Sequence, residues 1–322
     1  MKRLTMLGVL CGLTLLAAPA SAQFNGSHLL GDFGVQSGSQ PKPGVYAAMF
    51  YVRYDTDTIK DAAGNTVRPF PDSPGSVTVN ALAPMLWYVG QVKVFGANYG
   101  AFVAFPFANS SLEAPAIALS ESVDMSVSDM LVRPLDLGWH AKQADVSAGF
   151  QFYAPTGRYQ RGGRDNIGKG MWTYEPFVGT TLYLDEERSI SLATTAFWEL
   201  HGDKEDSDTR VGQILTLEGG GGKSFLGGGL IIGAAYYAQW KLTEDRLGQF
   251  VLPDGRPIDL DARNQHKVFA LGPDVTMPVA SKTKLFALVN VRYFWETGAR
   301  MKTQGNTLLV TTTFPVPSVT LK

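Results

Sequence analysis

The chain of 322 residues is 45% hydrophobic, 11% aromatic and 18% charged, and its formal net charge at pH 7 is −1. This balance provides no basic field to attract nucleic acid, and the one cysteine, Cys11, excludes a disulfide framework. After residue 22 no apolar run reaches the roughly 20 residues of a helical membrane span, which excludes helical membrane proteins.

The first residues have the pattern of an export signal. Lys2 and Arg3 precede a short apolar run, and the small residues Ala20-Ser21-Ala22 follow it. A basic head, a short apolar core and a small-residue site together predict a signal peptide over residues 1–22, cleaved after Ala22. We therefore expect an exported protein, and loss of Lys2 and Arg3 leaves 26 basic residues against 29 acidic ones.

Segment 23–44 is rich in glycine, serine and proline. Two interpretations of it stay open: a periplasmic tail, or a plug in the mouth of the barrel that the later residues predict. Residues 45–322 contain no linker, and we expect them to form one domain.

A period of two residues dominates the chain from residue 45 onward. In the first stretch one face is apolar from Tyr46 to Tyr54, and the other carries Arg53 and Asp55. This alternation is typical of strands whose two faces meet different environments. Along the chain it predicts about twelve strands, near residues 45–55, 76–88, 95–107, 122–139, 144–155, 171–184, 188–201, 210–223, 228–241, 264–277, 284–296 and 305–314.

The connections between these strands alternate in length. Those at 56–75, 108–121, 156–170 and 242–263 are long, whereas every second connection is a tight turn. Outer-membrane barrels sort their loops in this way, with short periplasmic turns and longer external loops. The sequence therefore predicts an all-β protein, an antiparallel transmembrane β-barrel in the bacterial outer membrane.

Several motifs resemble a known family. The carriers are Phe-Tyr-Ala-Pro-Thr-Gly-Arg-Tyr at 152–159, Asn-Ile-Gly at 166–168, Trp-Thr-Tyr-Glu-Pro at 172–176, Phe-Gly-Ala-Asn-Tyr-Gly at 95–100 and Ala-Tyr-Tyr-Ala-Gln at 235–239. Together they are similar to the outer-membrane family named for the MetA-pathway of phenol degradation. The resemblance implies an outer-membrane barrel that takes up hydrophobic, often aromatic, compounds linked to their catabolism. It implies no catalytic residues.

The alternation sends a set of polar residues to the face opposite the lipid. A charged side chain facing mid-bilayer lipid costs about 2–4 kcal/mol for Arg or Lys, so we expect these residues to line the lumen. With five acids and four bases, the set predicts no strong ion selectivity. Its members are Arg53, Asp129, Arg133, Glu175, Glu199, Glu218, Gln239, Lys241, Asp274, Asn290 and Arg292.

Loop 156–170 carries four basic residues, Arg158, Arg161, Arg164 and Lys169. One interpretation is a constriction or surface patch that attracts anions, including lipopolysaccharide phosphates. The other is an ordinary solvated external loop. The glycine run at 219–222 lacks the spacing of a phosphate-binding loop, and we expect it to bend strands or leave room inside the barrel.

The function expected from these features is passive uptake of a small hydrophobic or aromatic solute. A structural or adhesive barrel is the alternative, and a lipid-modifying enzyme using Ser191 and His201 is the less favoured one. We expect no cofactor, no metal site and no nucleic-acid partner. Outer-membrane lipid and lipopolysaccharide are the expected surroundings, and the sequence does not specify the oligomeric state.

Overall fold

The computed structural model describes residues 25–67, 75–115, 118–161, 163, 165–247, 249–251, 257–259, 265–281 and 285–316. The predicted signal peptide, residues 1–22, and Arg164 of the external loop lie outside these ranges.

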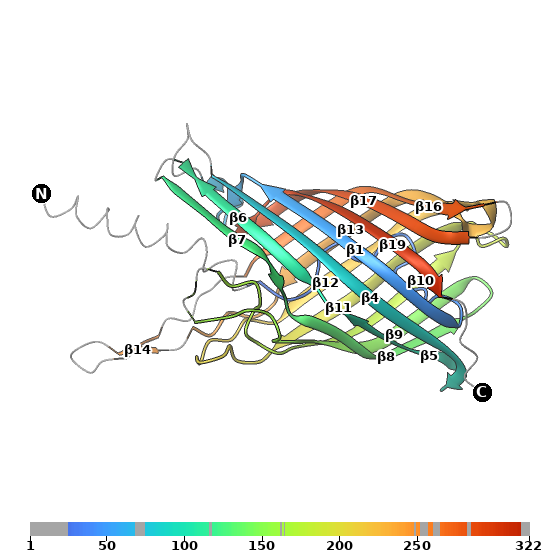
Figure 1. Ribbon diagram of the computed structural model, residues 1–322, viewed down its shortest axis with the longest axis horizontal. Coiled ribbons are helices and arrows are strands. Elements are labelled where there is room, and N and C mark those ends of the chain that lie inside the picture. Colours follow the sequence, from blue (N-terminus) through green and yellow to red (C-terminus); the bar gives the residue numbers. More distant parts are fainter. Residues whose placement is uncertain are drawn as a thin grey trace, which may run out of the picture.

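Twelve strands form a closed antiparallel barrel in the described part of the chain (Figure 1). Each strand pairs with its neighbours in chain order, and β1 pairs with both β4 and β19, which closes the ring. The predicted fold class and strand number are therefore confirmed. The strands are β1 (Gly44–Thr56), β4 (Ser76–Val94), β5 (Ala97–Ala104), β8 (Met130–His140), β9 (Ala144–Ala154), β10 (Thr173–Tyr183), β11 (Ile190–His201), β12 (Ile214–Phe225), β13 (Leu230–Lys241), β16 (Lys267–Ala280), β17 (Leu285–Arg300) and β19 (Asn306–Val316).

A hairpin of β6 (Phe107–Ala114) and β7 (Leu119–Val127) extends the wall beyond β5 and β8. β6 pairs with residues 76–82 of β4 and with β7, so the backbone groups of this stretch are bonded as strands. The prediction of a loop over 108–121 was wrong for this reason.

Several short strands lie at the end of the barrel that carries the long connections. β2 (Ile59–Lys60), β3 (Thr66–Val67) and β18 (Lys302–Thr303) form one small sheet, and β14 (Gln249–Val251) pairs with β15 (Pro257–Asp259). A 3-10 turn, η2 (Leu226–Gly228), follows β12, and among the described residues no helix has the length and apolar character to cross a membrane.

The two ends of the barrel differ as the loop lengths predict. Connections 95–96, 141–143, 184–189 and 226–229 are tight turns at one end, whereas 155–172, 202–213 and 242–266 connect strands at the other. Figure 1 shows the end of β19 at the short-turn end and β14 at the opposite one. By the rule for outer-membrane barrels, the short-turn end faces the periplasm.

Side chains alternate between the lumen and the outer surface. On β11, Phe197 and Glu199 are buried, whereas Leu192 and Trp198 are 49% and 44% exposed. Aromatic rings gather on the outer face of β9 and β10, where the Trp172 and Tyr174 centroids lie 6.4 Å apart. Exposed aromatic groups of this kind form the interfacial girdle of a membrane barrel.

Arg53 is placed differently from the prediction. Phe50 and Val52 are 2% and 4% exposed and point into the barrel, so Arg53 lies on the outer face, paired with Asp55 at 2.7 Å. The prediction assumed that the apolar face of β1 meets lipid. In the structure this face meets an apolar part of the lumen instead, which reverses the assignment for this strand.

The described part of segment 23–44 lies inside the barrel, and we call residues 25–43 the lumenal segment. The backbone N–H of Ser27 donates to Glu199 near the long-loop end of β11. The side chain of Gln40 donates to the carbonyl of Asp136 on β8, nearer the short turns. The segment therefore runs along the lumen before the chain enters β1 at Gly44.

Glycines in the wall make room for this segment. A Cβ at Gly222 would lie 3.2 Å from Val35 Cγ1, and a Cβ at Gly138 would lie 2.6 Å from the Cβ of Gln40. Side chains at these two positions would occupy the space that the segment fills. For Gly222, the interpretation that the glycine run leaves room inside the barrel is thus confirmed.

Candidate functional site

Three carboxylates from adjacent strands converge inside the barrel. Glu175 on β10, Glu199 on β11 and Glu218 on β12 are each 0% exposed. The strand alternation puts them on the inward face, and the pairing of β10, β11 and β12 brings them together. Buried carboxylates need cations or several hydrogen-bond donors to be stable in the charged form.

His28 of the lumenal segment lies between two of these carboxylates. Its Nδ1 is 3.0 Å from Glu175 Oε1 and its Nε2 is 3.2 Å from Glu218 Oε1. Because both ring nitrogens face carboxylates, the arrangement favours the imidazolium, which carries a proton on each nitrogen. Phe197 covers the ring, with centroids 4.5 Å apart. His28 is thus a positive charge that joins the segment to the wall.

The backbone of the lumenal segment also bonds to the wall carboxylates. Glu199 Oε1 accepts from the N–H of Ser27 at 2.6 Å and of His28 at 3.0 Å. Glu218 accepts from the N–H of Gly31 at 2.6 Å and of Phe33 at 2.9 Å. Such charge-assisted hydrogen bonds are stronger than neutral ones, and here they replace the secondary structure that the segment lacks.

Two arginines of the wall complete this polar side. Arg292 Nη1 donates to the carbonyls of Gly31 at 2.7 Å and of Asp32 at 2.5 Å. Arg133 donates to the side chain of Gln151 and lies over the ring of Phe33, 5.3 Å from its centroid. The segment therefore meets acceptors and donors that match its own backbone groups.

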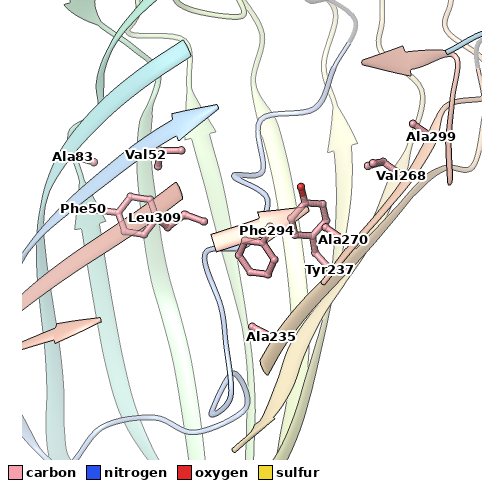
Figure 2. Packing of buried hydrophobic residues seen from close by; sticks show 10 residues of the cluster. All are labelled: Phe50, Val52, Ala83, Ala235, Tyr237, Val268, Ala270, Phe294, Ala299 and Leu309. Carbon is pink, nitrogen blue, oxygen red and sulfur yellow. The ribbon is translucent and has the colours of Figure 1, made fainter. Parts of the chain in front are cut away.

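The lumen has an apolar sector beside the polar one (Figure 2). The side chains come from β1, β4, β13, β16, β17 and β19 and pack against Leu29 and Leu30 of the lumenal segment. In Figure 2 they point into a common space that the blue coil of the segment passes through. We call this set the apolar sector; it consists of Phe50, Val52, Ala83, Ala235, Tyr237, Val268, Ala270, Phe294, Ala299 and Leu309.

Charged groups gather at the long-loop end of the lumen. Lys241 lies 2.7 Å from Asp245, and the ammonium group of Lys302 donates to Gln239 at 2.6 Å. Lys204 is buried in connection 202–213 and donates to the carbonyl of Lys169. Burial lowers the pKa of Lys204 to about 8, and the nearby charge of Lys169 adds to this effect.

Most of the predicted lumen residues are buried, although Asp129 precedes β8 and accepts from the backbone N–H groups of Gly157 and Lys169 in loop 156–170. One, Asn290, is half-buried and donates to Asp274, and Arg53 is the exception already described. Those that the structure buries are Asp129, Arg133, Glu175, Glu199, Glu218, Gln239, Lys241, Asp274 and Arg292.

The basic residues of loop 156–170 are not equivalent. Arg158 is exposed and lies 3.4 Å from Asp165, and Arg161 donates to the carbonyl of Asp206. Lys169 is half-buried, and its backbone N–H donates to Asp129. The loop is thus attached to neighbouring loops and to the barrel wall, and its role as an anion patch stays a prediction.

Sequence reasoning missed the partners that the lumenal segment contributes. His28 is a single histidine in a stretch without periodicity, so no pattern marked it. Glu296, which accepts from Tyr237 and Tyr54, was also missed. Its signal was present, because it continues the inward alternation of Asn290 and Arg292 along β17.

A closed antiparallel barrel with an aromatic outer girdle and a polar, charged lumen defines an outer-membrane β-barrel protein. The chain belongs to the family described as putative MetA-pathway of phenol degradation, whose model matches residues 56–312. The predicted family is therefore confirmed.

Solved structures show the same fold. The crystal structure of the COG4313 outer membrane channel from Pseudomonas putida F1 is 14% identical with a TM-score of 0.71, over 90% of this chain and 100% of that one. The transport unit of the autotransporter AIDA-I from Escherichia coli is 9% identical with a TM-score of 0.53, over 94% of this chain and 99% of that one. A comparison with curated proteins finds no significant match.

Proposed function

We propose that this protein is a passive outer-membrane channel for small hydrophobic compounds, including aromatic ones, and that solute passes when the lumenal segment moves aside. The observation that carries the proposal is the apolar sector, which faces the lumen in place of the lipid. A barrel that admits only water and ions has no need of an apolar inner wall. The family membership and the fold of the COG4313 channel support the same function.

The lumenal segment is the gate in this proposal. It is joined to the wall by hydrogen bonds and ion pairs of the kind that water replaces, with partners such as Glu199, Glu218 and Asp274. The chain enters β1 directly after it, so the segment is tethered and returns after each passage.

Two further elements belong to the proposal. Residues 1–22 act as the export signal, and lipid and lipopolysaccharide surround the outer wall. We propose no enzymatic role, because Ser191 donates to the carbonyl of Val35 and His201 Nδ1 contacts the carbonyl of Gly212, so the two side chains serve different contacts.

The test is the initial rate of naphthalene entry into energy-depleted Gram-negative cells that express the chain. We expect entry faster than in cells without it, saturable, and independent of an energy source. A hydrophilic sugar of similar size serves as the control solute and should enter at the same rate in both. Equal naphthalene entry in both cell types would contradict the proposal and favour a structural or adhesive barrel.

A further inference from the structure

Leu29 and Leu30 are held differently from their neighbours in the lumenal segment. The residues on either side, His28 and Gly31, are buried and bonded to wall carboxylates. The two leucine side chains are only half-buried and pack on the apolar sector. They are therefore held by apolar contact alone, with part of their surface left open to the lumen.

The apolar sector offers a surface suited to flat, nonpolar molecules. Phe50, Phe294 and Tyr237 supply aromatic rings, and the Tyr237 and Phe294 centroids lie 5.1 Å apart. The one polar atom among these three side chains, the Tyr237 hydroxyl, already donates to Glu296 at 2.8 Å. The hydroxyl hydrogen of Tyr237 is therefore not available to a solute on this surface, which favours hydrocarbons over polar aromatic compounds.

At its polar contacts with the wall, the segment cannot be replaced by an apolar molecule in this way. There the segment presents backbone N–H groups to Glu199, Glu218 and Asp274, and a hydrocarbon has no donor to replace them. An apolar molecule gains by entering the lumen only where it replaces apolar contacts. The two leucines are the part of the segment that such a molecule can replace.

From this geometry we propose that Leu29 and Leu30 occupy the solute-binding site as an internal substitute, and that a small nonpolar hydrocarbon competes with them for the apolar sector. The inference rests on the proposed function and adds to it the binding surface, the solute class and the competitor. Solute binding then releases the hydrophobic hold on the segment, so that arrival of the solute and movement of the gate are one exchange.

The test is a titration of the full chain in lipid nanodiscs with naphthalene, followed by NMR of 13C-labelled leucine methyl groups. Leu309 lies in the apolar sector and reports binding, while Leu29 and Leu30 report displacement. We expect saturable shifts of all three, with Leu29 and Leu30 moving toward the values of solvent-exposed leucines. Empty nanodiscs correct for naphthalene dissolved in the lipid.

Weakening the contact of Leu29 and Leu30 with the apolar sector should raise the apparent affinity of the protein for naphthalene. Naphthalene binds only while the two leucines are away from the site, so its apparent affinity falls with the fraction of time that the leucines occupy the site. The double variant Leu29→Ser, Leu30→Ser should therefore bind naphthalene about tenfold more tightly, as measured at Leu309. Leu226→Ser, at a leucine that is 78% exposed in the turn after β12, is the matched control and should leave the affinity unchanged.

The outcomes separate the two proposals. Naphthalene entry into cells without any shift of Leu309, or with the same affinity in the double variant, would overturn the binding site and leave the channel standing. Absence of both entry and binding would overturn the channel itself.

Discussion

His28 and Glu175 meet inside the barrel with 3.0 Å between Nδ1 and Oε1, although one belongs to the lumenal segment and the other to β10. Removal of one partner from a buried ion pair costs about 3–5 kcal/mol, because the other charge is left without compensation. In His28→Ala, Glu175 and Glu218 both lose this partner. We predict that the lumenal segment detaches from the barrel wall and that single-channel conductance rises.

The matched control for this prediction is His140→Ala. His140 also contacts a carboxylate, Asp145 at 3.1 Å, but its side chain is 31% exposed and lies at the short-turn end. Its replacement should leave conductance unchanged. If His28→Ala conducts like the wild type, the ion pair is not what holds the segment.

The contact between Val35 and Gly222 predicts a reciprocal pair of effects. Because a Cβ at Gly222 would lie 3.2 Å from Val35 Cγ1, Gly222→Val should push the segment out and raise its cleavage by chymotrypsin. Val35→Gly in the same chain should restore protection by returning the space. Residues in contact typically show coupling energies of about 0.5–3 kcal/mol. Additive effects of the two substitutions would mean that Val35 does not rest on this glycine.

The lowered pKa of Lys204 predicts a pH dependence of connection 202–213. In the folded loop Lys204 releases its proton near pH 8, whereas an ordinary lysine does so near 10.5. Between these values the opened loop binds more protons than the folded one, so the stability of the loop increases as pH rises. Proteolytic cleavage within 202–213 should therefore decrease from pH 8 to pH 10, relative to an unstructured peptide cleaved in parallel.

Lys204→Gln is the control for this prediction, because glutamine does not titrate. Its cleavage rate, corrected with the same peptide, should be flat over the range. A wild-type rate that is equally flat would mean that Lys204 is not held in the buried position seen against the carbonyl of Lys169.

The sequence predicts the position of a strand well, but it predicts which face of the strand meets lipid only where the apolar face is the outer one. Alternation located the strands, since burial alternates along the whole of β10 and β11 and separates lipid-facing Trp198 from lumenal Glu199. It failed at Arg53, because the apolar face of β1 serves the lumen and alternation assigns faces without naming their surroundings. Alternation did not identify His28, because the segment that carries it has no regular secondary structure and therefore no periodic pattern.

The position of the membrane is tested by arginines on the outer face of β11. Ala196 lies midway along the strand, and Arg there should cost about 2–4 kcal/mol of unfolding free energy in lipid. Ile190→Arg, at the short-turn end of the same face, should cost about 0–1 kcal/mol. Chemical denaturation of the barrel in lipid vesicles measures both. Equal costs would contradict the placement of the bilayer along the strand.

The central claim, that solute passes only when the lumenal segment moves, is tested most directly by a reversible lock. Positions 35 and 222 are close enough for a disulfide, and the only cysteine, Cys11, lies in the predicted signal peptide. We predict that Val35→Cys, Gly222→Cys abolishes protein-dependent naphthalene entry when oxidised and recovers it when reduced, while either single variant is insensitive to the reductant. Equal entry in the oxidised and reduced states would contradict the account.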